Sequence, residues 1–151
     1  MAFLYLCPTK KQMGRIVAID YGQKRVGIAV TDTLQLIANG LTTVSPDTIF
    51  SFLEAYTQKE KVDEFIVGLP KQMNNEPSES MKYITPFVTG LKKKYPNTPV
   101  LFVDERFTSK LAQQTMLDSG INKKSRQNKA LIDQISATII LQSYLESRMY
   151  K

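Results

Sequence analysis

The chain contains no histidine, no tryptophan and a single cysteine among its 151 residues. The absence of histidine excludes Ser-His-Asp and Cys-His catalysis, HEXXH zinc sites and imidazole acid–base chemistry. The one cysteine, Cys7, allows no disulfide within the chain and is typical of a reducing compartment. Any catalysis must therefore use carboxylates, cations, hydroxyl groups or a metal ion held by oxygen ligands.

Long hydrophobic runs are also absent. The apolar stretch near the N-terminus is about six residues long, shorter than the core of a secretory signal, and its lysines follow it. No segment approaches the roughly 20 apolar residues of a membrane span. We interpret residues 1–12 as a flexible extension and 13–151 as a single domain, and we expect a cytoplasmic protein without membrane association.

Acidic residues are outnumbered by basic ones, 14 to 20, which gives a net charge of +6 and a pI of about 9.4. A basic domain of this size favours polyanionic partners, nucleic acid before an acidic membrane surface. Charge alone is equally consistent with a cationic protein that binds neither, so the function must be sought in particular residues.

Apolar and helical patterns alternate along the chain. Apolar runs predict strands over residues 15–20, 25–31, 36–44, 64–70 and 100–105. Helical spacing predicts helices over residues 45–59, 81–91, 108–120 and 128–148. We expect Ser45 to cap the first helix, with Pro46 at its first position. Strands separated by helices pair in parallel, so the pattern predicts an α/β fold with a mixed sheet and helices on both faces.

Acidic residues occupy positions where open α/β sheets place their sites. Asp20 ends the first strand, and Asp104 and Glu105 end the last one. Asp133 lies in the final helix, on a small and apolar face that is expected to pack on the sheet. Converging carboxylates repel one another unless a cation lies between them. Since the chain has no histidine, oxygen ligands of this kind indicate Mg²⁺ or Mn²⁺.

Each of these carboxylates has a simpler interpretation. Asp20 alone could be a turn residue that accepts hydrogen bonds from the following backbone. Asp104 and Glu105 point to opposite faces of a strand, so one of them could be solvated. Asp133 could act electrostatically at the start of its helix. The metal-site hypothesis depends on the three segments taken together.

Cationic residues accompany each acidic segment. Lys24 and Arg25 lie in the first turn, and Arg106 follows the carboxylates of the last strand. The segment that leads into the final helix contains Lys123, Lys124, Arg126 and Lys129. Such residues suit contact with a phosphate backbone without reading its sequence, although a solvated basic loop is the ordinary alternative.

Four segments, AIDYGQKRVGIAVTD, VGLP, VDERFTS and KALIDQISATIILQSYL, resemble the YqgF/RuvX family of Holliday-junction-resolvase-like nucleases in order and spacing. The resemblance covers residues 13–147 and implies a ribonuclease H-like fold, with a mixed five-stranded sheet flanked by helices. The family's acidic positions correspond to Asp20, Glu105 and Asp133, which implies that these residues are catalytic and hold the metal. Asp104 also matches the family's pattern, and we rank it below Glu105.

The resemblance implies metal-dependent hydrolysis of phosphodiesters, in which two ions about 3.5–4 Å apart activate water and stabilise the leaving oxygen. The favoured substrate is the 5′ end of pre-16S rRNA, with a pre-ribosomal particle as a possible partner, and four-way DNA junctions are the alternative. A junction resolvase is expected to be a dimer, so monomer and homodimer both stay open. A non-catalytic nucleic-acid-binding module is a further alternative, which the presence of all three acids disfavours.

Overall fold

The computed structural model of the protein describes residues 14–69, 81–104 and 129–149. The extension over 1–12 and the helix expected over 108–120 lie outside these ranges. None of the helices within the described residues combines the length and the apolar character that a membrane span requires.

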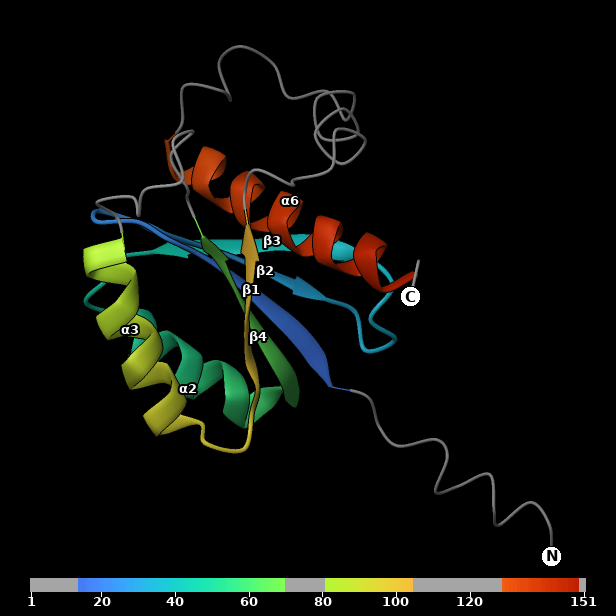
Figure 1. Ribbon diagram of the computed structural model, residues 1–151, viewed down its shortest axis with the longest axis horizontal. Helices are drawn as coiled ribbons and strands as arrows, with labels where there is room; N and C mark the ends of the chain where they lie inside the picture. The colour runs from blue at the N-terminus through green and yellow to red at the C-terminus, as the bar shows by residue number, and fades with distance from the viewer. Residues whose placement is uncertain (1–13, 70–80, 105–128, 150–151) are drawn as a thin grey trace, which may run out of the picture.

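Five strands form one mixed sheet. They are β1 (Arg15–Tyr21), β2 (Val26–Thr31), β3 (Ala38–Val44), β4 (Val62–Leu69) and β5 (Val100–Asp104). Their order across the sheet is β3-β2-β1-β4-β5, with β2 antiparallel to both its neighbours and β4 parallel to both of its own. The mixed five-stranded sheet is therefore confirmed, and the carboxyl ends of β1, β4 and β5 lie at one edge (Figure 1).

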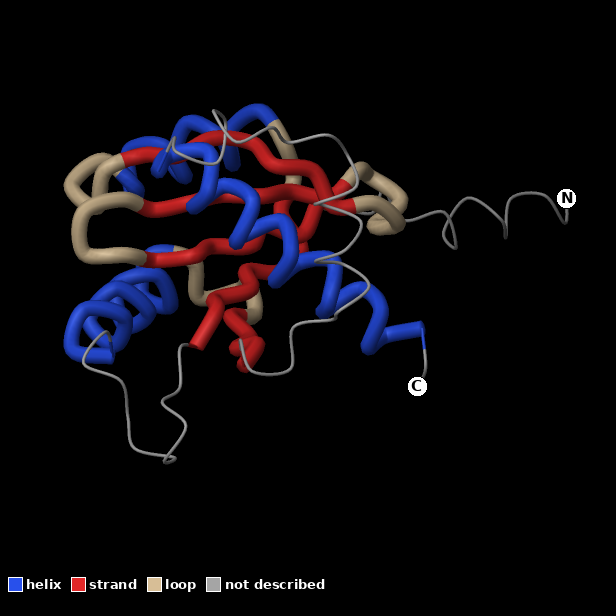
Figure 2. Tube along the Cα trace, turned by 90° about the horizontal axis from the view of Figure 1, so that it is seen from above, coloured by secondary structure: helices blue, strands red, loops and turns tan. Residues whose placement is uncertain are grey.

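Helices cover both faces of the sheet, as the sequence predicts. They are α2 (Ile49–Lys59), α3 (Met81–Lys94) and α6 (Lys129–Met149). Helices α2 and α3 lie on one face and α6 lies on the other (Figure 1). Seen from above in Figure 2, α6 runs across the strands that it covers. The domain thus has three layers, with a separate hydrophobic core on each side of the sheet.

The central strand β1 divides its side chains between the two cores. Val17 and Ile19 join the core beneath α2 and α3, whereas Ile16 and Ala18 join the core beneath α6. All four are fully buried, which explains why the sequence shows an unbroken apolar run instead of an alternating one. Because side chains alternate along a strand, Asp20 continues the series that faces α6.

Helix α6 packs directly on glycines of the sheet. A Cβ atom on Gly27 of β2 would overlap the carbonyl oxygen of Asp133. A Cβ atom on Gly40 of β3 would lie 2.6 Å from the Nε2 atom of Gln134. Only glycine permits the backbone of a helix to approach a strand this closely. The start of α6 therefore lies in a notch formed by β2 and β3.

Hydrogen bonds fix both ends of α6 to the sheet. The hydroxyl of Thr43 on β3 donates to the carbonyl oxygen of Ala130 over 2.5 Å. Near the other end, the Tyr144 hydroxyl donates to Oε2 of Glu64 on β4 over 2.8 Å. Burial and this hydrogen bond raise the pKa of Tyr144 to about 12. The helix is thus held at two points as well as by its apolar face.

Helix α2 starts later than the sequence analysis expects. It begins at Ile49, with Thr48 at its N-cap position and without a hydrogen bond from the cap side chain. The Ser45 carbonyl instead accepts the Thr48 backbone N–H over 3.1 Å, which closes a turn. The prediction that Ser45 caps the helix and that Pro46 opens it is wrong, because the chain leaves β3 at Val44 and must turn before a helix can lie on the sheet.

Replacing Gly27 with alanine is expected to lower the free energy of unfolding by about 3 kcal/mol, because the backbone of α6 would have to move. Gly40→Ala is the matched control and is expected to cost about 1 kcal/mol, since it meets side-chain atoms that can rotate away. Urea unfolding followed by circular dichroism measures both losses. Equal losses of unfolding free energy in the two variants, or a larger loss for Gly40→Ala, would contradict the close approach of the α6 backbone to Gly27.

Tyr144→Phe is expected to remove one phenol that ionises near pH 12 from the tyrosinate absorbance titration. Because the folded-state pKa lies above the ordinary value of about 10, the burial and the hydrogen bond of Tyr144 together contribute stability that is fully present below about pH 10. The stabilisation is lost as the pH rises through the folded-state pKa. If the phenol that disappears in the variant ionises near pH 10 instead, the buried, hydrogen-bonded position of Tyr144 is not present in solution.

Candidate active site

Asp20 lies near the carboxyl end of β1, half-buried and on the face covered by α6. Its partner across the antiparallel β1–β2 pair is Gly27. Directly opposed residues of such a pair share a face, with Cα atoms about 4.5–5.5 Å apart. Since the backbone of Asp133 rests on Gly27, the start of α6 lies over the neighbour of Asp20. The structure therefore brings together two of the three acidic segments predicted from the sequence.

The carboxylate of Asp133 forms an ion pair with Arg25. The Arg25 Nε atom donates to Oδ2 of Asp133 over 2.7 Å. The two side chains are 38% and 26% exposed, so the pair is partly shielded from water. Arg25 is held in place by the hairpin turn, in which the Gly22 N–H donates to the Arg25 carbonyl over 2.9 Å. From the sequence, Arg25 is expected to contact phosphate, and no local pattern indicates this partner within the protein.

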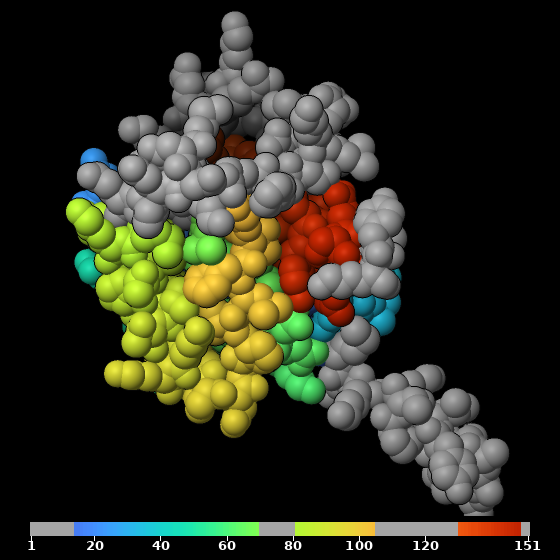
Figure 3. Space-filling model, viewed as in Figure 1, coloured from blue at the N-terminus to red at the C-terminus, as the bar shows by residue number. Residues whose placement is uncertain are grey.

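Asp104 ends β5 on the opposite face of the sheet. Val103 packs against the core beneath α6, so its neighbours in the strand face the other way. Phe102 agrees with this alternation, because Lys92 of α3 lies 6.0 Å from the centre of its ring. Figure 3 shows β5 at the surface between α3 and α6. Asp104 therefore lies on the face away from Asp20 and Asp133.

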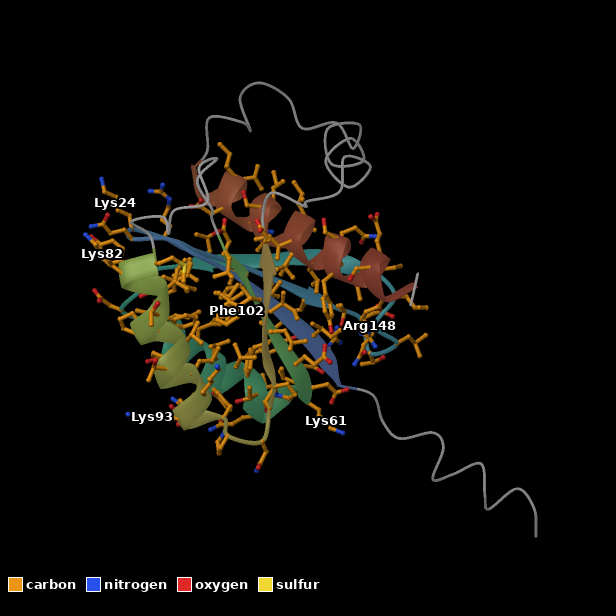
Figure 4. All side chains as sticks on the ribbon, viewed as in Figure 1. Lys24, Lys61, Lys82, Lys93, Phe102 and Arg148 are labelled. Atoms are coloured by element: carbon orange, nitrogen blue, oxygen red, sulfur yellow. The ribbon has the colours of Figure 1, made fainter. Side chains whose placement is uncertain are left out.

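Lys24 is exposed, in the turn that also carries Arg25, and forms no ion pair with any described residue. In Figure 4, Lys24 and Lys82 extend from the same end of the molecule, while Lys61 and Lys93 lie at the other end. Lys82 lies in the first turn of α3 and is not among the cations singled out from the sequence. No motif marks it among the 20 cations of the chain.

Most of the remaining predicted site residues lie outside the described part of the chain. These are Glu105, Arg106, Lys123, Lys124 and Arg126, together with the side chain of Lys129.

Two of the described carboxylates are candidates for part of a metal site. Asp20 and Asp133 offer carboxylate oxygens, the donors that Mg²⁺ and Mn²⁺ prefer, and Arg25 engages one oxygen of Asp133. Within 14–69, 81–104 and 129–149, no three carboxylate or thiol side chains lie close enough together to hold an ion. The donor chemistry fits a hard divalent cation, and the described pair needs at least one further oxygen ligand.

Comparison with known proteins decides the family. Residues 14–147 match a family model described as "RuvX: Holliday junction resolvase". The chain belongs to the RuvX family. The resemblance seen in the four sequence segments is thereby confirmed, and with it the expectation of an enzyme from a nuclease family.

Relatives of high identity within the RuvX family share one name. A protein of Bacteroides thetaiotaomicron named "Putative pre-16S rRNA nuclease" is 66% identical over 138 residues, which cover 91% of this chain and 100% of that protein. Proteins of the same name from Flavobacterium johnsoniae and Porphyromonas gingivalis are 59% and 56% identical. They align with 91% and 89% of this chain and with 100% and 98% of their own lengths.

The chain also resembles solved structures of another protein. The structure of T. thermophilus RuvC in complex with Holliday junction substrate matches with a TM-score of 0.57 and 16% identity, over 91% of this chain and 97% of that one. A further Thermus thermophilus RuvC structure matches with a TM-score of 0.54. This likeness confirms the ribonuclease H-like fold.

A double-mutant cycle measures the ion pair at this site. Arg25→Ala, Asp133→Ala and the double variant are unfolded with urea in the presence of a chelator. Because the pair is short but only partly buried, the coupling free energy is expected to be about 1 kcal/mol. A coupling of zero would mean that the two side chains do not pair in solution.

Proposed function

We propose that the protein is a divalent-metal-dependent endonuclease that processes the 5′ end of pre-16S rRNA. The observation that carries the proposal is the convergence of Asp20 and Asp133 on one face, at the carboxyl end of β1. Family membership and the shared name of relatives that are 56–66% identical support the nuclease and its RNA substrate.

Asp20, Asp133 and Glu105 would hold the metal, which is Mg²⁺ or Mn²⁺. When bound, such an ion supplies activation of water and stabilisation of the leaving oxygen. Asp20 is positioned by a strand that is buried on both faces, and Asp133 by the backbone contact of α6 with Gly27. Two rigid elements thus fix two of the proposed ligands before any ion binds.

Glu105 is the third proposed ligand. Val103 faces α6 and Asp104 faces away from it, so a strand that continued in the same extended form would bring the following residue, Glu105, to the face of Val103. Strands β1 and β5 are two strand spacings apart, about 10 Å, because β4 lies between them. The longer side chain of glutamate suits this distance better than that of aspartate.

The phosphate backbone would be held by cations around these acids. Lys24 and Lys82 extend from the same end of the molecule, where each could contact a polyanion without reading its sequence (Figure 4). The sequence adds Arg106, Lys123, Lys124, Arg126 and Lys129 to this proposed surface. RNA is the favoured partner, free or within a pre-ribosomal particle, in the cytoplasm.

Cleavage of four-way DNA junctions is the second candidate function. The description of the matching family names Holliday junction resolvase, which favours this substrate. Paired cuts in a symmetric junction need two active sites, so this function requires a homodimer, whereas trimming of an RNA end is compatible with a monomer.

Parallel cleavage assays test the proposal. An RNA that spans the 5′ end of pre-16S rRNA, free and in pre-ribosomal particles, and a four-way DNA junction are incubated with the full chain in Mg²⁺, Mn²⁺ or chelator. We expect metal-dependent cutting of the RNA. Asp20→Asn is expected to cut at least about 100-fold more slowly, because several kcal/mol of charge stabilisation depend on the metal.

Asp47→Asn is the matched control, since it removes the same charge from an exposed carboxylate and is expected to cut at the wild-type rate. Cutting of the DNA junction alone would establish the second candidate instead. Equal rates for Asp20→Asn and the wild type would show that the site lies elsewhere. Binding of either substrate without cutting under any condition would favour a non-catalytic module.

A further inference from the structure

In the ion pair between Arg25 and Asp133, the positively charged guanidinium contacts a carboxylate that is proposed to bind the metal. Other ion pairs of the fold, such as Arg15–Glu60 and Lys94–Glu54, lie away from the proposed site and are longer, at 3.2 Å each. The Nε atom of Arg25 lies 2.7 Å from Oδ2 of Asp133 and so occupies a ligand position of that oxygen.

Both partners of this pair are fixed by their backbones. Asp133 belongs to the part of α6 that rests on Gly27, and Arg25 belongs to the turn closed by the Gly22 N–H. Only the side chains of Arg25 and Asp133 can therefore change position when a divalent cation binds. A divalent cation bound to Asp133 would lie within a few ångströms of the guanidinium, and like charges at such a distance repel strongly.

We propose that Arg25 is a positioning residue that competes with the divalent cation for Asp133, so that the protein binds the ion weakly until nucleic acid is present. The inference rests on the proposed function. In the absence of an ion, the guanidinium neutralises and orders Asp133. A phosphate of the substrate offers Arg25 another acceptor of suitable geometry, because guanidinium groups form paired hydrogen bonds with phosphate oxygens. Once the phosphate takes Arg25, Asp133 is available to the ion.

Competition of this kind makes the binding of nucleic acid and of the ion cooperative. Either the nucleic acid or the ion must break the Arg25–Asp133 pair to bind, and once one of them has done so the other binds more tightly. The coupling free energy between the two binding events must be the same in both directions. The hairpin turn would then respond to phosphate through Arg25, which the sequence suggests only as a contact to the phosphate backbone of nucleic acid.

Titration with Mn²⁺ in the absence of nucleic acid tests the competition. The full chain, Arg25→Gln and Lys93→Gln are compared by calorimetry. We expect Arg25→Gln to bind Mn²⁺ about tenfold more tightly than the wild type, because a nearby positive charge is removed. Lys93→Gln loses the same charge from an exposed side chain at the other end of the molecule (Figure 4), and it is expected to change the affinity by less than about twofold.

The direction of the change separates competition from a structural role. If Arg25 only stabilised the site, Arg25→Gln would bind Mn²⁺ more weakly, and that result, or an unchanged affinity, overturns the proposal. Arg25→Lys keeps the charge, so its affinity for Mn²⁺ is expected to stay near that of the wild type. A change seen only in Arg25→Gln can then be assigned to the lost charge and not to a folding defect. Thermal melting in chelator is expected to show a lower Tm for Arg25→Gln, because Asp133 loses its partner.

Failure of the proposed function gives a different result. If neither the wild type nor Arg25→Gln binds Mn²⁺, the metal site itself is wrong and the inference falls with it. If the wild type binds Mn²⁺ but Arg25→Gln does not bind it more tightly, only the inference falls. The RNA affinity, measured by anisotropy in Ca²⁺ and in chelator, is expected to depend about fivefold less on the ion in Arg25→Gln. Equal dependence in both proteins contradicts the cooperativity.

Discussion

The contact between the backbone of Asp133 and Gly27 is the constraint on which the rest of the candidate site depends. A side chain at position 27 would push α6 away from β2. Because Gly27 is also the register partner of Asp20, the same contact decides how near the two carboxylates come. The hairpin places Arg25 just before Gly27, so the cation that pairs with Asp133 is fixed by the same short segment. The absence of a side chain at Gly27 thus allows Asp20 of β1, Asp133 of α6 and the guanidinium of Arg25 to lie close together.

The electrostatics of the site follow from that geometry. Carboxylates at the end of a buried strand and at the base of a packed helix are costly unless other groups compensate for the lost water. For Asp133 the compensation in this structure comes from Arg25 at 2.7 Å. A divalent ion could compensate both acids at once, and it would then have to displace the guanidinium. Under the proposed competition the site would have two alternative states of charge balance, and a phosphate that attracts Arg25 would shift the balance towards the ion.

Local patterns in the sequence predict the parts of this arrangement that depend on neighbouring residues. The apolar run before Asp20 predicts a strand buried on both faces, and Ile16 and Val17 do join different cores. The helical spacing from Asp133 to Ala137 and Ile140 predicts the face that packs on the sheet, and both apolar residues are buried there. Contacts between distant segments leave no such pattern. Neither the pairing of Arg25 with Asp133 nor the late start of α2 can be derived without knowing where β2 and β3 lie. Glu105 lies outside the described residues and stays a prediction.

The most direct test of the central claim is the anomalous diffraction of crystals grown with Mn²⁺. We predict a manganese peak within about 2.5 Å of carboxylate oxygens from both Asp20 and Asp133, the distance range of oxygen ligands to hard divalent cations. The Arg25 guanidinium is predicted to have left Asp133 in the same crystals. A manganese ion that contacts neither carboxylate, or an intact Arg25–Asp133 pair beside an ion bound elsewhere, would contradict the claim that α6 and β1 meet to form a metal site.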